Sequence, residues 1–160
     1  MNMSKSFQIE NYLSSVDIKS RRMFTKLRTS AHSLNIETGR FSKKTRDLRI
    51  CNLCNCKQIE NEHHFLLKCP YYSKERLSFL KSIDFLILPR DSETKFKILM
   101  SCLSGDIELA KPICDFVKHC FDMRNEFFCN QRASEIKTKS PVTTKSGRVS
   151  KPLHRLIEVI

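Results

Sequence analysis

The chain has 160 residues, with 29 Lys or Arg against 17 Asp or Glu, so its formal net charge is +12. This length is enough for one domain and a tail, and it excludes a polymerase or a multidomain enzyme. Glycine occurs only 3 times, and the sequence contains neither of the glycine-rich motifs that bind nucleotide phosphates. The longest apolar run has about four residues, far short of the ~20 that cross a bilayer.

The N-terminal residues lack the apolar core of a signal peptide, so we expect an intracellular protein, nuclear or cytoplasmic and not secreted, without membrane contact. Thiols stay reduced there, and the 8 cysteines therefore favour metal ligation over disulfides. The net charge is +7 in residues 1–50, +2 in 51–90, −1 in 91–133 and +4 in 134–160. Basic ends of this kind favour nucleic-acid phosphates as partners, although a basic surface also promotes solubility alone.

Residues 17–35 are the first stretch with helical periodicity, because apolar side chains recur three and four positions apart. These apolar residues are Phe24, Leu27, Ala31 and Leu34. Residues 1–16 have no such pattern, and we expect them to form a flexible N-terminus. Gly39 is expected to end the helical region, which leaves residues 40–49 as a basic, irregular connection.

The middle of the chain is predicted to contain two further helical segments. A pattern that starts near Glu62 pauses at Pro70, a residue suited to the first turn of a following helix. Asp91 or Ser92 is expected to cap the next helix, because both side chains accept hydrogen bonds from free amides. Gly105 is expected to end it.

A last helix is predicted to run to about Arg132, with Pro112 either in its first turns or at a kink. Its buried residues are expected to be Ile113, Phe116, Val117, Cys120, Phe121 and either Phe127 or Phe128. Four cysteines without paired spacing are expected to be buried as small apolar residues: Cys102, Cys114, Cys120 and Cys129. Residues 134–160 contain too few apolar side chains to offset an ordering cost of ~1–2 kcal/mol per residue, and we expect a disordered basic tail.

Three cysteines and one histidine stand at metal-ligand spacing. Two residues separate Cys51 from Cys54, nine separate Cys54 from His64, and four separate His64 from Cys69. Three thiolates and an imidazole are typical of a structural, four-coordinate Zn²⁺ site. Because four protein ligands leave no open position, we expect one structural zinc ion and no catalytic metal, with residues 49–72 unfolding when it is removed.

Two neighbouring residues remain alternatives as ligands. Cys56 could replace Cys54, and His63 could replace His64 if the helix register shifts by one residue. The sequence thus predicts a mainly α protein, with a helical zinc-binding domain over residues 17–133 and a short zinc-knuckle-like turn that carries the Cys3His site.

The same region resembles the zinc-binding segment that follows the polymerase domain in non-LTR retrotransposon reverse transcriptases. The similarity is specific over about residues 24–72 and looser as far as Arg132. The matching stretches are residues 27–34, 37–40, 49–54 and 60–72. The resemblance implies His64 as the histidine ligand. The family's paired catalytic aspartates have no counterpart here, because the aspartates are scattered, and the basic residues 144–156 weakly resemble the ends of retroelement polyproteins.

In that family the segment is thought to hold template RNA or target DNA, so the resemblance implies RNA or DNA as partner, bound through phosphates. The implied phosphate contacts are Arg21, Arg22, Lys26, Arg28, Arg40, Lys43, Lys44, Arg46 and Arg49. Phe65 and Tyr72 are the aromatic residues considered for stacking on bases, with a core position as the competing interpretation of Phe65. His32 is expected on a helix surface or in packing.

The leading functional hypothesis is a non-enzymatic, zinc-stabilised nucleic-acid-binding module derived from a retrotransposon reverse transcriptase. The alternatives are a zinc-ordered helical module that binds a protein partner, and a non-functional retroelement remnant. An enzyme is disfavoured, because no histidine has a nucleophile or carboxylate partner at motif spacing. The sequence leaves the choice between RNA and DNA, and the oligomeric state, undecided.

Overall fold

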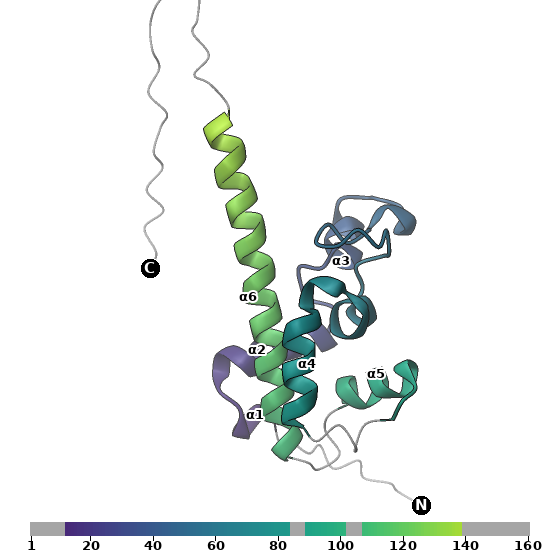
Figure 1. Cartoon of the computed structure of the whole chain (residues 1–160), viewed down its shortest axis with the longest axis vertical. Helices are drawn as coiled ribbons and strands as arrows, with labels where there is room; N and C mark the ends of the chain where they lie inside the picture. The colour runs from purple at the N-terminus through teal and green to yellow at the C-terminus, as the bar shows by residue number, and fades with distance from the viewer. Residues whose placement is uncertain (1–11, 84–88, 102–106, 139–160) are drawn as a thin grey trace, which may run out of the picture. The chain divides into compact units, whose positions relative to one another are not determined.

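The computed structural model describes residues 12–83, 89–101 and 107–138 (Figure 1). Its helices are α1 (Tyr12–Ser15), α2 (Ile18–Arg28), α3 (Asn35–Phe41), α4 (Ser73–Ser82), α5 (Ser92–Ser101) and α6 (Ile107–Thr138), with 3-10 helices η1 (Arg46–Leu48) and η3 (Pro70–Tyr72) and the π-helix η2 (His64–Lys68). Within the described residues there is no strand, only an isolated antiparallel bridge between Ile50 and Ile59. The expected mainly α fold is confirmed.

The N-terminal region is more ordered than we expected. Tyr12 and Val16 are almost fully buried, so the expectation of a flexible segment is wrong for residues 12–16. Asp17 then caps α2 by accepting hydrogen bonds from the amides of Lys19 (2.9 Å) and Ser20 (3.1 Å). Two of the apolar residues foreseen in the first helix, Phe24 and Leu27, are fully buried.

The expected helix over residues 17–35 is in fact two helices. Ser30 has a φ of 54°, a left-handed conformation that ends α2, and Ala31 is exposed. His32 is buried in the connection, where its Nδ1 accepts from the amide of Leu34 (3.3 Å). Its Nε2 therefore carries the proton and donates to Glu62 (2.9 Å). These contacts with residues far along the chain override the local helical pattern.

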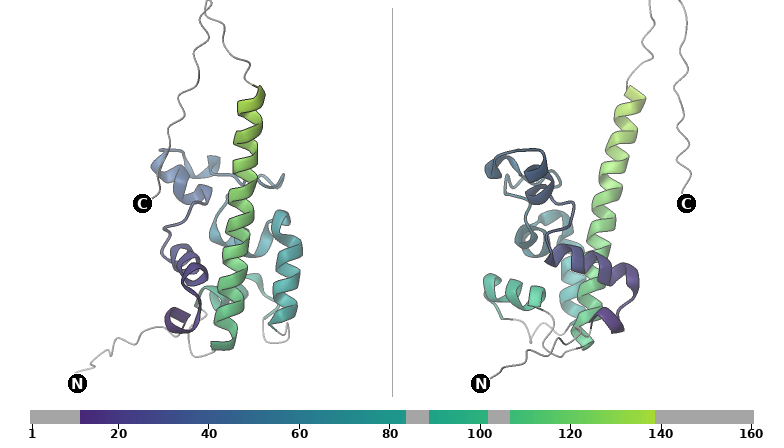
Figure 2. Two further views of the ribbon diagram at one scale, coloured as in Figure 1. Left: turned by 90° about the vertical axis from the view of Figure 1, so that its left-hand side faces the viewer. Right: turned by 180° about the vertical axis from the view of Figure 1, so that it is seen from behind.

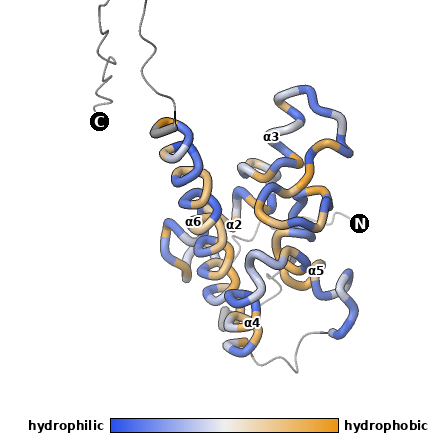
Figure 3. The backbone as a smooth tube through the Cα atoms, turned by 45° about the horizontal axis from the view of Figure 1, so that its top comes forward, coloured by the Kyte–Doolittle hydropathy of each residue, from blue (hydrophilic) through white to orange (hydrophobic). Residues whose placement is uncertain are grey.

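Gly39 lies inside α3, so the expectation that it ends a helix is wrong. A Cβ atom at this position would lie 2.6 Å from Cγ of Arg49. Glycine is thus needed for the close approach of that side chain. Figure 3 shows the loop that follows α3 mainly in hydrophilic colours.

The helices α2 and α4 lie against the N-terminal half of α6 (Figure 2). The Ser20 hydroxyl in α2 donates to Asp115 in α6 (2.7 Å). In α4, the ring of Phe79 stacks on that of Phe116, with centroids 4.6 Å apart.

Asp91, one of the two expected capping residues, caps α5 by accepting a hydrogen bond from the amide of Thr94 (2.6 Å). The disordered tail was expected from residue 134, but residues 134–138 belong to helix α6, so the expectation is wrong for them. Gly105, Cys102 and residues 139–160 lie outside the described residues.

α6 contains Pro112 in its second turn and continues to Thr138, beyond the expected end near Arg132. Five of the residues foreseen as its core are buried: Ile113, Phe116, Val117, Cys120 and Phe121. The expectation that Phe127 or Phe128 is buried is wrong, because both are only half-buried. Cys114 is buried as expected, whereas Cys129 is exposed. The chain divides into two compact units after Asn125, and the sites described below lie in the first unit.

Candidate metal centre

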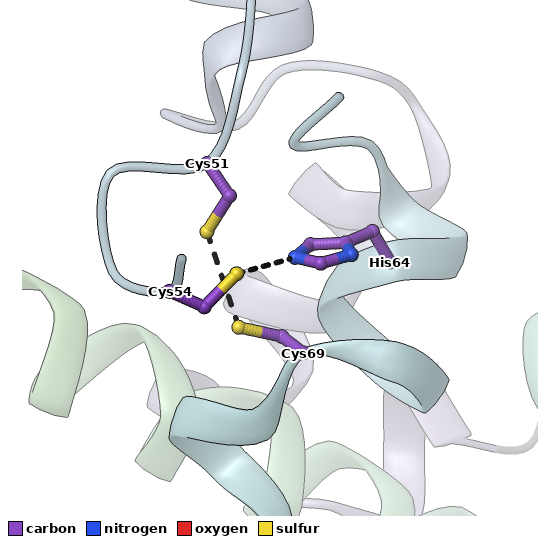
Figure 4. Close-up of side chains that lie close together, drawn as sticks. All are labelled: Cys51, Cys54, His64 and Cys69. Atoms are coloured by element: carbon purple, nitrogen blue, oxygen red, sulfur yellow. Dashed lines mark hydrogen bonds between the residues drawn. The ribbon is translucent and has the colours of Figure 1, made fainter. Parts of the chain in front are cut away.

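Four side chains from one short segment converge on a point: Cys51, Cys54, His64 and Cys69 (Figure 4). One donor atom from each lies within 4.8 Å of the others. The Sγ atoms of Cys51 and Cys69 are 3.9 Å apart, and Sγ of Cys54 is 3.4 Å from Nε2 of His64. A disulfide needs about 2.05 Å between sulfurs, so these thiols are free. The group can hold one metal ion.

A tight hairpin presents the first two cysteines. The amide of Cys51 donates to the carbonyl of Gln58 (2.8 Å), and the amide of Glu60 donates to the carbonyl of Arg49 (2.9 Å). Between Cys51 and Gln58 the chain reverses direction, and Lys57 in this turn has a left-handed φ of 51°. This hairpin brings the residues on both sides of the turn together and directs the two thiols to one side.

The other two donors flank the π-helix η2. The amide of Cys69 donates to the carbonyl of His64 at 2.7 Å, five residues earlier. In an α-helix with 3.6 residues per turn, residues five apart point in directions about 140° apart. The wider π-turn brings them to the same side. The four-residue spacing between His64 and Cys69 thus gives converging donors only because this turn is a π-turn.

Gln58 orients the His64 ring, a role that we did not foresee from the sequence. Its Oε1 atom lies 3.1 Å from Nδ1 of His64. An amide oxygen only accepts, so Nδ1 carries the proton and Nε2 faces the sulfurs with its lone pair. A second partner of the metal-binding histidine is common in metal sites, because it fixes the tautomer and the ring orientation.

The three thiols influence one another. The contact with the Cys69 sulfur, followed by burial, raises the pKa of Cys51 to about 12. The same contact lowers the pKa of Cys69, and burial raises that of Cys54. Adjacent thiolates repel each other in a largely buried group, so a bound cation is what would allow all three to be deprotonated together.

The structure excludes both alternative ligands from the group. Nε2 of His63 is 3.1 Å from Oγ of Ser92, and its ring meets that of Phe96 edge-on at 5.2 Å. His63 therefore packs against α5 and faces away from the sulfurs. Cys56 is exposed and does not belong to the cluster.

The nine basic residues named as phosphate contacts fall into two groups. Four lie on α2: Arg21, Arg22, Lys26 and Arg28, of which Arg22 is exposed and the others are half-buried. The guanidinium of Arg28 covers the rings of Tyr12 (5.7 Å) and Phe24 (5.9 Å). The second group begins in the last turn of α3 and continues beyond it, and its members Arg40, Lys43, Lys44 and Arg46 are exposed. We call residues 40–46 the cationic loop.

Arg49, the ninth basic residue, has hydrogen-bond partners within the fold. Its Nε and Nη2 atoms donate to the carbonyl of Lys44 (3.1 and 2.9 Å), and Nη1 donates to the carbonyl of Ile36 (2.9 Å). The guanidinium thus binds main-chain carbonyls before and within the cationic loop and supports its conformation. Arg49 therefore has a structural role, and its expected contact with phosphates stays a prediction.

The two aromatic residues considered for base stacking are core residues. Phe65 and Tyr72 are each 1% exposed and meet edge-on at 5.0 Å. Phe65 also packs against Phe121 of α6 at 4.7 Å. Neither ring is accessible to a base.

Comparison with protein-family models, with curated proteins and with solved structures gives no match for this chain. Among the described residues, no helix combines the length and the apolar character needed to span a membrane.

Proposed function

We propose that this chain is a non-enzymatic module that binds RNA or DNA and is stabilised by one structural Zn²⁺ ion, comparable with the segment that follows the polymerase domain in non-LTR retrotransposon reverse transcriptases. The observation that carries this proposal is the attachment of the cationic loop to the metal-binding hairpin. Arg49 holds the loop through its guanidinium, while its own carbonyl accepts from Glu60 within the hairpin. Metal binding would therefore order the surface that meets phosphates.

The donor set favours zinc. With Zn–S and Zn–N bonds of about 2.3 and 2.05 Å in a tetrahedron, two sulfurs lie about 3.8 Å apart and a sulfur and a nitrogen about 3.6 Å apart. One sulfur pair here is 3.9 Å apart and one sulfur–nitrogen pair 3.4 Å, and all donor atoms lie within 4.8 Å of one another. Thiolate and imidazole ligands suit zinc better than Mg²⁺ or Ca²⁺, which prefer oxygen. Four protein donors leave no position for a reactive water, which supports a structural role.

The cationic loop supplies charge for phosphates. Four basic side chains lie within seven residues, and residues 38–46 contain no acidic residue. The charge of Arg40 is partly compensated by Glu37, whose Oε2 lies 2.8 Å from Nη2 of Arg40. The side chains of Lys43, Lys44 and Arg46 are exposed. Such a concentration of positive charge favours a polyanion through release of its condensed counterions.

A hollow of about 550 Å³ lies between α4 and α6 within the described residues. It is lined by the stacked rings of Phe79 and Phe116, by the carboxylates of Asp115 and Glu75 and by His119. Asp115 already accepts hydrogen bonds from Ser20 (2.7 Å) and Lys111 (2.6 Å). Asp115 is engaged in this way and is poorly placed to act as a base, so we do not assign a reaction to this hollow.

Metal content tests the first half of the proposal. Mass spectrometry of the purified chain should find one zinc ion, which Cys69→Ser should lose and Cys56→Ser should retain, because Cys56 is exposed and outside the cluster. Excess chelator should reduce the far-UV circular dichroism signal and lower the Tm, since structural zinc contributes folding free energy. An unchanged spectrum and Tm in chelator would contradict the proposal.

Salt-dependent binding tests the second half. Fluorescence anisotropy with labelled oligonucleotides should give an affinity that falls steeply with salt, and Lys43→Gln with Lys44→Gln should reduce both the affinity and the slope. The absence of binding at ~50 mM salt, where phosphate contacts are strong, would reject nucleic acid as the partner. Capture of a protein partner that survives nuclease would then support the alternative, a protein-interaction module.

A further inference from the structure

Phe41, at the C-terminal end of α3, is 77% exposed, more than any other large apolar residue among those described. The remaining exposed large apolar residues are aliphatic: Ile18, Leu48, Ile50, Leu77 and Ile136. A single exposed apolar side chain is common and needs no explanation. Phe41, however, is an exposed aromatic ring inside the cationic loop, and this combination points to a binding role.

One cation contacts the ring of Phe41, and two more basic residues follow it in the sequence. The guanidinium carbon of Arg40 lies 5.2 Å from the ring centroid, a cation–π contact on one face. The ring's high exposed fraction means that the rest of its surface is open to solvent. Lys43 and Lys44 follow within three residues. An aromatic face next to several cations is the combination with which proteins bind a single strand, by stacking on the base and attracting the phosphate.

The backbone holds this arrangement in a defined conformation. The amides of Ser42 and Lys43 donate to the carbonyls of Thr38 (3.1 Å) and Arg40 (3.1 Å). Lys43 adopts a left-handed φ of 55°. The carbonyl of Lys44 accepts two hydrogen bonds from the Arg49 guanidinium. The end of α3 and the lysines are thereby fixed relative to each other, which lowers the entropy cost of binding.

We infer that Phe41 is a stacking platform for an unpaired base, so that the cationic loop binds single-stranded nucleic acid. This inference rests on the proposed function and deepens it. A base pair in a duplex is already stacked on both sides and offers only phosphates to this surface, so an exposed aromatic ring contributes to binding only where bases are free.

The test uses the full, zinc-loaded chain and labelled oligonucleotides of about 12 nucleotides, in DNA (dT), RNA (U) and abasic DNA of equal length. Phe41→Ala should weaken binding to the dT and U probes roughly 5- to 150-fold, the range for loss of one stacked base. It should change binding to the abasic probe less than about 2-fold, since no base is present to stack. Leu77→Ala, which removes an exposed apolar residue from α4, is the matched control and should change neither.

A spectroscopic readout is available because the chain contains no tryptophan. Phe41→Trp should restore affinity, and its fluorescence should be quenched by dT and U but not by the abasic probe. Leu77→Trp should not be quenched by any of the three probes. Preference for dT over U, or the reverse, would identify the strand as DNA or RNA.

The outcomes separate the two proposals. If Phe41→Ala weakens no probe and Phe41→Trp is not quenched, while the double lysine variant still weakens all three, the stacking inference is overturned and the proposed function stands. If the unaltered chain binds none of the probes at ~50 mM salt, the proposed function itself fails. The Tm of each Phe41 variant should match that of the unaltered chain, because the side chain is exposed.

Discussion

Arg124 of α6 donates one hydrogen bond to each carboxylate oxygen of Glu60, both at 2.9 Å, and the two side chains are 7% and 1% exposed. The same carboxylate accepts from the amide of Asn35 at the start of α3 (2.7 Å). Glu60 directly precedes the segment that carries His64 and Cys69. One buried ion pair therefore fixes the metal-binding hairpin to α3 and to the long C-terminal helix.

Arg124→Ala should lower the free energy of unfolding by about 3–5 kcal/mol, because it leaves the Glu60 charge buried without a partner. Urea denaturation of the zinc-loaded chain measures this change. Replacing both members, with Glu60→Gln and Arg124→Met, should recover much of the loss, since no charge then remains buried. Lys118→Ala, which removes an exposed ion pair of the same helix, is the control and should have little effect. A small effect of Arg124→Ala would contradict the importance of this buried ion pair for stability.

Gln58→Ala should weaken zinc binding by about 10- to 100-fold while leaving the helical content unchanged. Without the amide oxygen, the His64 ring loses the partner that fixes its tautomer and orientation. Competition with a chromophoric chelator measures the affinity. Asn52→Ala, an exposed residue of the same hairpin, is the matched control and should bind zinc normally. Equal affinities for the two variants would refute the orienting role of Gln58.

Gly39→Ala should destabilise the protein by about 1–3 kcal/mol, although alanine is the better helix former. The added Cβ displaces the Arg49 side chain, 2.6 Å away, from its carbonyl partners. The effect should change sign when Arg49 is already alanine, because the clash is then absent and only the helix preference of up to ~1 kcal/mol remains. Thermal unfolding of the four proteins in this cycle tests the prediction, and additive effects would contradict it.

Asp17 should make the free energy of unfolding depend on pH in the acidic range. The Ser20 side chain and the amides of Ser20 and Lys19 hold the pKa of Asp17 below its usual range. A carboxyl whose pKa is lower in the folded state contributes stability above its unfolded pKa, near 3.8, and loses it as the pH falls further. The substitution Asp17→Asn introduces an asparagine, which also caps helices but does not titrate. The difference in Tm between the two proteins should therefore be constant from pH 7 to about 5 and shrink below about pH 4. A constant difference down to about pH 2.5 would contradict this account.

Features with local causes could be predicted from the sequence. The four metal donors were identified because ligand spacing over nineteen residues is itself the signal, and the core positions Phe24, Ile113 and Phe121 follow from helical periodicity. The cap at Asp91 was foreseen for the same reason, since a capping side chain acts within three residues.

The features that were missed depend on contacts between distant residues. The division of the first helix depends on His32 bonding to Glu62, thirty residues later, and the role of Gly39 depends on Arg49. The structural role of Arg49 was missed because its charge is visible in a sequence, whereas its carbonyl partners are not. Gln58 had one usable signal, its place in the gap between Cys54 and His64, where polar residues often support a ligand.

The π-turn between His64 and Cys69 has a consequence for how this segment tolerates change. Of its interior residues, Leu67 is half-buried and Lys68 is exposed, so these two can be exchanged more freely than Phe65 and Leu66, which are each 1% exposed and belong to the core. The number of interior residues cannot change, because loss of a single codon would convert the turn to ordinary α-helical spacing, and gain of one would rotate the thiol past the imidazole. Homologous chains should therefore vary here in composition while keeping the length constant.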